Sequence, residues 1–299
     1  MKLLREVRRD WELYFMLALP ILALLIFSYI PMFGLVIAFQ DYDVFAGVAA
    51  SPWVGLKHFA SLFTLEEFPR VLGNTLLISL YKILFYYPVP ILLAIMLNEV
   101  SHSGFKRTVQ TVVYLPHFIS WAIVSGLVFD LLSSTGLINT ILWRLGGERV
   151  NFLTTPAYFR SIVVISAIWK EAGYGAIVYL AAITGIDPSL YEAAKIDGAS
   201  RLRQIRHITL PGIAPVCVLM LILRLGTVMD ANFEQMFTLL NPTVMDTGDV
   251  LSTYIYRNGL TQMRYSYSTA AGLFNSVVAF LLVLMANAFS RRLVGRSIW

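Results

Sequence analysis

The sequence predicts an all-α polytopic membrane protein with six transmembrane helices. Of its 299 residues 58% are apolar and only 14% are charged, whereas soluble domains carry about 25% charged residues. The mean hydropathy is +0.70. A helix needs about 20 apolar residues to cross a hydrocarbon core of about 30 Å. Runs of this kind lie near residues 14–39, 73–98, 109–132, 160–183, 212–230 and 269–290.

The first run follows a basic segment, as a secretion signal would. It is about 25 residues long and lacks a small-residue cleavage site, so we expect a retained helix. The second run contains Pro88 and Pro90. These prolines remove backbone hydrogen bonds and predict a kink, which serves either as a hinge or as a static packing feature. No soluble domain separates the runs, so residues 1–299 are expected to form a single transmembrane domain.

Lys and Arg residues predict the orientation, because cytoplasmic loops are enriched in them. With the N-terminus inside, thirteen of the 23 Lys and Arg residues fall on inner segments and seven on the longer outer loops. Both termini, and the loop 187–211, are therefore expected on the cytoplasmic side. The inner residues are Lys2, Arg5, Arg8, Arg9, Lys106, Arg107, Lys195, Arg201, Arg203, Arg206, Arg291, Arg292 and Arg296.

The loop 187–211 is polar and has local signals for two short helices. Asp187 is a favourable N-cap, and Pro188 fits the first helical position. Gly198 suits the left-handed position that ends a helix. We expect a second short helix from about residue 199 to 207, running up to Pro211.

The same loop carries a family resemblance. Glu192-Ala193-Ala194, then Gly198, Ile208 and Leu210-Pro211 match the signature of permease subunits of ATP-binding-cassette importers. The resemblance implies that 187–211 contains the coupling helix, which docks into the ATPase subunit. It assigns this role to Glu192, Ala193, Ala194 and Gly198. Asp197 is either a further coupling residue or the cap of the second helix.

Other segments resemble the carbohydrate permeases of this family. They are Trp53-Val54-Gly55-Leu56 with Phe59, Asn74-Thr75, Leu97-Asn98-Glu99, Phe233-Glu234-Gln235, and Gly248-Asp249 before Thr253-Tyr254.

The resemblance implies the type I importer fold, with a peripheral first helix and five core helices. It implies half of a translocation path for an oligosaccharide, in a prokaryotic cell membrane. The implied partners are a second, non-identical permease subunit, two ATPase subunits and an extracytoplasmic solute-binding protein. The large outer insert of maltose-type permeases is missing.

No enzyme chemistry is evident in the residues. The sequence lacks a Gly-Lys pair and therefore a G-x-x-x-x-G-K-[ST] phosphate loop, so ATP and Mg²⁺ are expected on a partner subunit. The four histidines are scattered and lack metal-ligand spacing. We expect a non-catalytic subunit with membrane lipid as a neighbour and without cofactor, metal or nucleic acid.

Charges inside the apolar runs predict the substrate path. Such charges are costly and usually face a bundle interior or a water-filled cavity. The cations outnumber the acids here, which suggests a cavity for a polar sugar, with an acidic sugar as one hypothesis. Aromatic residues such as Tyr81 and Tyr86 would either stack on sugar rings or serve only in helix packing. The candidate path residues are Asn74, Lys82, Trp169, Lys170, Glu171, Tyr174 and Arg224.

Two alternatives stay open at this point. The first is structural: Lys82 or Lys170 pairs with Glu171, while Arg224 extends its head group outward to the interface. The second is functional: an ion-gradient-coupled secondary transporter of a polar solute. Such a carrier needs an intramembrane acid, and Glu171 is the candidate, but it does not need the Glu-Ala-Ala loop.

Overall fold

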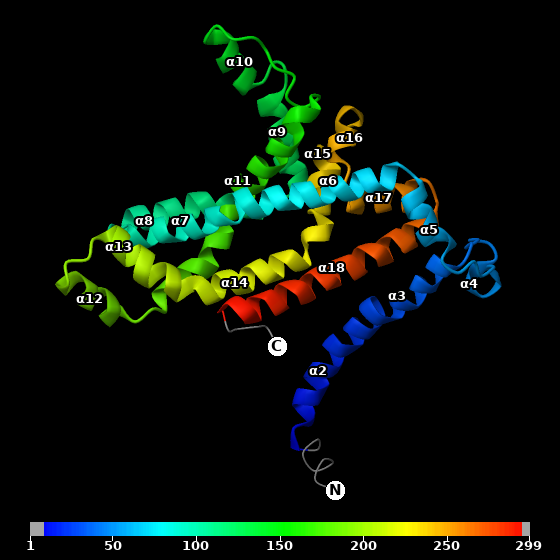
Figure 1. The fold of residues 1–299 in the computed structure, drawn as a ribbon, viewed down its shortest axis with the longest axis horizontal. Helices are drawn as coiled ribbons and strands as arrows, with labels where there is room; N and C mark the ends of the chain where they lie inside the picture. The colour runs from blue at the N-terminus through cyan, green and yellow to red at the C-terminus, as the bar shows by residue number, and fades with distance from the viewer. Residues whose placement is uncertain (1–8, 295–299) are drawn as a thin grey trace. The chain divides into compact units, whose positions relative to one another are not determined.

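A computed structural model of the protein describes residues 9–294, with side chains described for residues 9–288 (Figure 1). Its regular elements are helical, apart from one isolated antiparallel bridge between Gln40 and Trp53 within the described residues. Among the described residues, six helices are long and apolar enough to cross a membrane, which confirms the predicted class. They are Trp11–Phe39, Glu67–Glu99, Trp121–Arg144, Pro156–Thr184, Arg201–Gly226 and Tyr265–Ala288.

Two compact units make up the chain. The first contains residues up to Thr64 together with Ile255–Phe274, and the second contains Leu65–Tyr254 together with the residues from Asn275 onward. In the first unit, the long N-terminal helix consists of α2 (Trp11–Leu24), η1 (Leu25–Tyr29), α3 (Ile30–Met32) and η2 (Phe33–Phe39). In the most apolar stretch of 18 residues in this helix, only 6% of the residues are buried, as expected for the predicted peripheral first helix.

The loop after this helix is held by polar contacts around Asp41. Its carboxylate accepts a hydrogen bond from Lys57 Nζ at 2.6 Å and contacts His58 Nε2 at 3.0 Å. The bond from Lys57 lowers the pKa of Asp41 below its ordinary value. Tyr42 N donates to Ser266 Oγ at 2.9 Å in the same unit. The unit also contains α4 (Gly47–Ala50), α5 (Lys57–Thr64), η8 (Arg257–Thr261) and the start of α18 (Tyr265–Val294).

The second unit is built around α11 (Pro156–Thr184), the most buried of the six spans. It packs against α7 (Pro88–Glu99) and α8 (Ser103–Tyr114). At Gly173 the two backbones approach so closely that a Cβ would overlap the Val113 carbonyl. A small residue at a helix contact of this kind lets neighbouring transmembrane helices come together. The other elements of the second unit are α6 (Glu67–Tyr81), η3 (Lys82–Tyr86), η4 (Leu115–Phe118), α9 (Trp121–Leu132), α10 (Leu137–Arg144), α12 (Pro188–Ile196), α13 (Arg201–Gln204), η5 (Ile205–Thr209), α14 (Leu210–Gly226), η6 (Val228–Asp230), α15 (Phe233–Leu239), η7 (Pro242–Val244), α16 (Met245–Gly248), most of α17 (Leu251–Tyr256) and the later part of α18.

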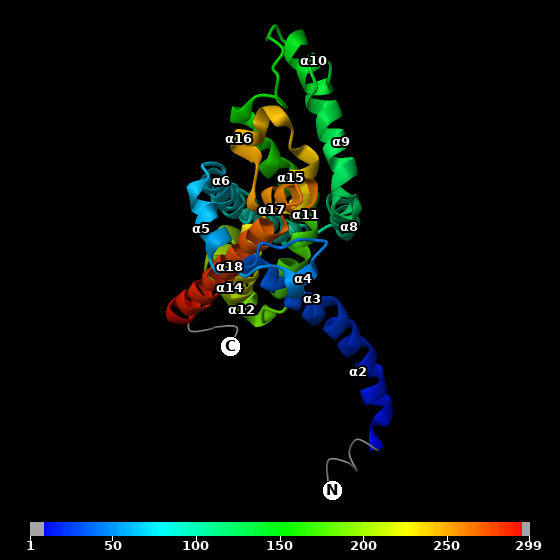
Figure 2. The ribbon, with the colours of Figure 1, turned by 90° about the vertical axis from the view of Figure 1, so that its right-hand side faces the viewer.

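The predicted run 109–132 is interrupted, so the expectation of one continuous helix there is wrong. Helix α8 ends at Tyr114, and Ile119 is extended. Pro116 lies in the connecting turn, and Ser120 Oγ caps α9 by accepting from Ile123 N at 3.4 Å. Figures 1 and 2 show that α9 and α10 extend away from α7 and α8 within this unit.

Three π-turns each end two residues before a proline. They are η1, η3 and η5, and the prolines are Pro31, Pro88 and Pro211. A proline lacks the N–H for the carbonyl four residues back, and its ring clashes with that carbonyl. A wider turn relieves both conflicts. The structure has a π-turn over residues 82–86 just before Pro88, while the kink predicted at Pro88 and Pro90 stays a prediction.

The same device corrects the expectation for the fifth span. We expected a short helix ending at Pro211 and a separate span from 212 to 230. Instead, one helical stretch runs from Arg201 to Gly226, because η5 lets the helix continue through Pro211.

Candidate functional sites

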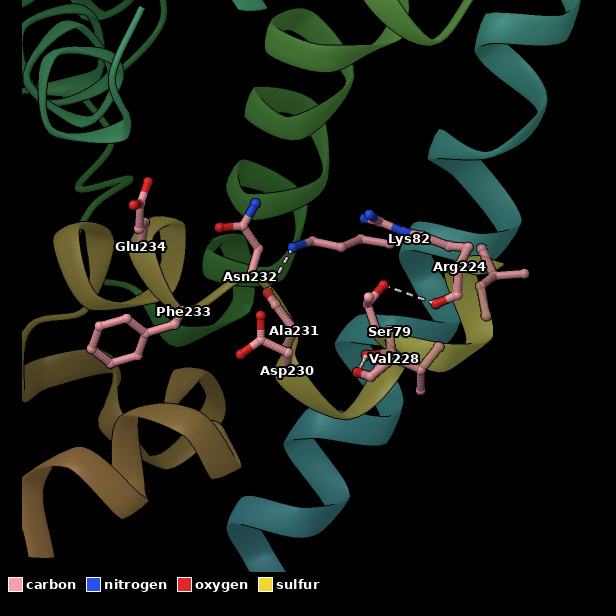
Figure 3. Close-up of a pocket in the computed structure, with 11 residues that line it drawn as sticks. Ser79, Lys82, Arg224, Val228, Asp230, Ala231, Asn232, Phe233 and Glu234 are labelled. Atoms are coloured by element: carbon pink, nitrogen blue, oxygen red, sulfur yellow. Dashed lines mark hydrogen bonds between the residues drawn. The ribbon is translucent and has the colours of Figure 1, made fainter. Parts of the chain in front are cut away.

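A polar cavity of about 380 Å³ lies in the second unit, where α14 gives way to η6 and α15 (Figure 3). This volume is within the range of small-molecule sites. The cavity wall combines α6 and η3 with the chain that follows α14. Its polar lining residues are Ser79, Lys82, Arg224, Thr227, Asp230, Asn232 and Glu234.

A sharp backbone corner at Ala231 and Asn232 shapes this cavity. Both residues have a positive φ, 50° for Ala231 and 64° for Asn232. A non-glycine residue in this region is strained and needs support from its surroundings. Asn232 supports the corner through Oδ1, which accepts from Gln235 N at 3.3 Å and caps α15. Its Nδ2 donates to Glu171 Oε1 at 3.4 Å.

Lys82 also supports this corner. Its side chain is buried, and Nζ donates to Ala231 O at 2.9 Å (Figure 3). Nζ also donates to Gln235 Oε1 at 2.7 Å. Gln235 is completely buried and donates in turn to Val163 O at 2.6 Å. Lys82 is thus engaged with backbone and amide acceptors, although it borders the cavity.

Lys170 is also engaged with the protein. It is buried, and Nζ donates to His117 O at 2.7 Å at the break between α8 and α9. Tyr174 stacks on the His117 ring at 3.8 Å, and Trp169 is 49% exposed. These three residues do not line the polar cavity. Within the described part of the chain, neither Lys82 nor Lys170 forms an ion pair with Glu171, so the structural pairing considered above is wrong.

Asn74 lies away from the cavity and joins distant segments. Its Nδ2 donates to Asp246 O at 3.0 Å and to Asp249 O at 3.1 Å. Arg160 donates to its Oδ1 at 2.9 Å. Because all three contacts are internal and Asn74 is buried, it holds the segment 246–249 and does not line the polar cavity.

Arg224 is the cavity cation that the protein leaves available. It lies in the last turn of α14, with its guanidinium 5.2 Å from the Tyr86 ring centroid. It also lines an adjoining cavity of about 240 Å³ together with Tyr86 and Tyr179. No ion pair of Arg224 is found among the described side chains. Arg224 therefore connects the two cavities.

Acidic residues balance the cations in this cavity. Asp230 and Glu234 line it together with Lys82 and Arg224, so the predicted excess of positive charge is wrong for this cavity. Sequence reasoning missed Asp230 and Asn232 because they lie at or just beyond the end of the fifth apolar run. The polar cluster that follows Arg224 in the sequence was the available signal.

The loop 187–211 contains the helix that its sequence predicts. Helix α12 spans Pro188–Ile196, and Asp187 Oδ1 accepts from Ser189 N at 2.9 Å. Hydrogen bonds from Ser189 lower the pKa of Asp187. Gly198 has φ +73°, as a left-handed helix end requires. Ala199 N donates to Ala194 O at 2.8 Å and closes this end.

Helix α12 presents most of its surface outward, and no residue in it is buried. Glu192, Ala193 and Asp197 are exposed, while Ala194 is half-buried. Ile196 beside them is 86% exposed. The N-cap position of α13 is taken by Ser200, so the alternative that Asp197 caps the second helix is wrong.

Comparison with known proteins identifies the family. Residues 86–295 match the family described as the inner membrane component of binding-protein-dependent transport systems. The chain belongs to this family. It is a multi-pass membrane protein and the permease, not the ATP-hydrolysing subunit. This membership excludes the gradient-driven carrier considered above.

Individual relatives cover the whole chain. The polygalacturonan/rhamnogalacturonan transport system permease protein YteP of Bacillus subtilis (strain 168) is 47% identical over 299 residues, which is 100% of this chain and 93% of that protein. A chain from a bacterial ABC transporter involved in the import of the acidic polysaccharide alginate is 50% identical, with a TM-score of 0.92. The match covers 98% of this chain and 99% of that one. A second structure, in complex with an alginate pentasaccharide-bound periplasmic protein, also has a TM-score of 0.92, with 49% identity and complete coverage of both chains.

Proposed function

We propose that this permease forms half of the translocation path of an ATP-driven importer for oligosaccharides, with carboxylate-bearing sugars as the preferred class. A second permease subunit, non-identical to this one, completes the path. A solute-binding protein delivers the sugar from outside, and two ATPase subunits hold ATP and Mg²⁺. The permease itself carries no cofactor. The names of the relatives support the substrate class, since they refer to polysaccharides.

The polar cavity supports this proposal from the side of the chemistry. Its wall carries hydroxyl, amide and carboxylate groups that suit sugar hydroxyls, and Arg224 suits a sugar carboxylate. A guanidinium binds a carboxylate through two parallel hydrogen bonds. Lys82 is already engaged with Ala231 and Gln235, so it contributes to the shape of the cavity.

The orientation proposed for the chain follows from the distribution of Lys and Arg. Both termini lie on the cytoplasmic side, together with the loop 187–211. Residues 1–8 and 295–299, on which part of that distribution rests, lie outside the described residues. With this orientation α12 faces the compartment that contains ATP.

Helix α12 is the proposed contact with the ATPase. Its exposed face combines the Glu192 carboxylate, the small Ala193 and the apolar Ile196. Small side chains permit close approach to a groove wall, and the carboxylate can pair with a cation there. This outward face of a capped, short helix is the observation on which the ATP-driven mechanism rests.

A pull-down from detergent tests this proposal. We expect the wild-type permease, expressed with its own transport proteins, to retain an ATP-hydrolysing partner, and Glu192→Lys to lose it or its stimulation by substrate. Glu148→Lys makes the same charge change at an exposed residue outside α12 and serves as the control. Retention of a normally stimulated ATPase by Glu192→Lys would show that Glu192 is not part of the contact.

The substrate class is tested at Arg224. We expect Arg224→Gln to reduce uptake of a uronate oligosaccharide about 10- to 150-fold, as loss of about 1.5–3 kcal/mol from a charged hydrogen bond implies. Uptake of the carboxyl-reduced oligosaccharide of equal length should change little. Equal losses for both sugars would contradict a carboxylate contact at Arg224.

A further inference from the structure

Helix α12 is separated from the rest of the second unit by a polar cavity of about 730 Å³. The cavity is lined by the end of α7, the end of α11, the inward side of α12 and the start of α13. Since no residue of α12 is buried, packing alone does not fix its position. A side-chain contact across the cavity would carry a displacement of α12 to the membrane-spanning helices.

Tyr191 spans this gap. It is the half-buried residue next to Glu192, and its hydroxyl lies 2.9 Å from Thr209 Oγ1. Thr209 is only 1% exposed. Of the side-chain hydrogen bonds described for residues 188–196, the bond between Tyr191 and Thr209 is the one that reaches a helix long enough to span the membrane. This contact could not be predicted from the sequence, because Tyr191 and Thr209 are 18 residues apart and on separate elements.

Thr209 lies at the end of the π-turn η5, within the continuous helical stretch Arg201–Gly226. At a rise of 1.5 Å per residue this stretch is about 40 Å long. Its far end carries Arg224, which lines the polar cavity. A single helical rod therefore connects the residue bonded to Tyr191 with the residue proposed to bind the sugar.

The other tie near this end of the rod is weaker. Arg201 approaches Glu99 at 3.8 Å, and the two side chains are 75% and 35% exposed. An exposed ion pair at this distance is screened by water and salt and fixes geometry poorly. Tyr191, with two rotatable side-chain bonds before a rigid ring, is better suited to transmit a displacement.

We propose that Tyr191 is a positioning residue that couples α12 to the helix Arg201–Gly226 through its hydrogen bond with Thr209. The inference rests on the proposed function, since it takes α12 as the ATPase contact. ATP-driven movement of α12 pulls or pushes Thr209, and the rod carries that movement to Arg224. Loss of the hydroxyl leaves the docking face intact but breaks this connection.

The test uses the whole transporter, with its ATPase and binding protein, in proteoliposomes. We expect Tyr191→Phe and Thr209→Val each to retain the ATPase, while the sugar transported per ATP hydrolysed falls about fivefold or more. The double variant should be no worse than either single variant, because both remove the same bond. Tyr158→Phe removes a hydroxyl from an exposed tyrosine outside the loop and should leave the ratio unchanged.

Two results would overturn the inference. One is an unchanged transport-to-hydrolysis ratio in Tyr191→Phe when Glu192→Lys does uncouple the transporter. The other is loss of the ATPase from Tyr191→Phe, which would make the bond a requirement for assembly. The failure of the proposed function looks different, because then Glu192→Lys would also leave ATPase retention and coupling unaltered.

Discussion

Lys82→Met separates a structural lysine from a substrate-binding one. Lys82 Nζ has two acceptors, Ala231 O and Gln235 Oε1, and the side chain is 3% exposed. Methionine has a similar length, so the packing of the stem is retained while both acceptors lose their donor. The change therefore isolates the two hydrogen bonds.

The expected cost follows from the surroundings of the two acceptors. A buried acceptor left without a donor costs about 1–3 kcal/mol, so two cost about 2–6 kcal/mol. Ala231 borders the cavity, where water can replace the lost donor, so the lower part of this range applies. We expect a loss of about 2–3 kcal/mol. A loss of 1 kcal/mol lowers the melting temperature of a domain of 150–250 residues by roughly 2–4 °C, which gives about 4–12 °C here.

The first measurement is the thermal unfolding midpoint of the purified permease in detergent. The second is the uptake of acidic sugar relative to carboxyl-reduced sugar by the full transporter. Lys195→Met removes an ammonium group from an exposed position and should leave the midpoint unchanged. In Lys82→Met the midpoint should fall while the sugar preference persists in the folded fraction. An unchanged midpoint with a lost preference for acidic sugar would refute the reasoning.

Three further predictions concern other parts of the chain. Asn74→Leu removes the donor to Asp246 O and Asp249 O and leaves Arg160 without its amide partner, so hydrogen exchange of residues 242–250 should accelerate at least tenfold; unchanged exchange would contradict the assigned role. Gly173→Ala places a Cβ against the Val113 carbonyl and should cost about 1–3 kcal/mol, measured by thermal unfolding, whereas Gly126→Ala meets nothing within 4 Å and should be tolerated. Asp41 has a lowered pKa in the folded loop, so it stabilises the loop above the ordinary aspartate pKa of about 4, and this contribution is lost as the pH falls through the lower folded value. Hydrogen exchange of residues 40–57 should therefore rise, relative to Asp41→Asn at equal pH, on acidification through that window; parallel curves for the two proteins would argue against it.

The features that the sequence predicts well are local ones. Asp187, Pro188 and Gly198 each act within a few residues, so their capping roles can be assigned without a tertiary structure. The presence of six spans could be predicted, because a helix that crosses the bilayer needs about 20 apolar residues, but the bounds of the third and fifth spans were wrong. Pro116 and Ser120 were also local signals for the break after α8, but the apolarity of the run 109–132 concealed them.

The roles of the buried polar residues could not be predicted in the same way. Lys82 meets Ala231 across 149 positions, and Asn74 meets Asp249 across 175. Their charge and depth indicate an interior location, but whether the partner is substrate or backbone depends on the packing of distant helices. Arg224 remains available for a ligand because no described acidic side chain lies within ion-pair distance of it, although Asp230 and Glu234 line the same cavity. This arrangement is a property of the fold and not of the neighbours of Arg224 in the sequence.

Uptake into proteoliposomes containing the purified permease, its partner permease, the ATPase and the binding protein tests the central claim most directly. The measurement follows a labelled uronate oligosaccharide, with ATP on the side of α12 and no ion gradient across the membrane. The account predicts accumulation that requires ATP hydrolysis, resists ionophores and is lost in Glu192→Lys. Uptake that proceeds without ATP and disappears when an ion gradient is dissipated would contradict it.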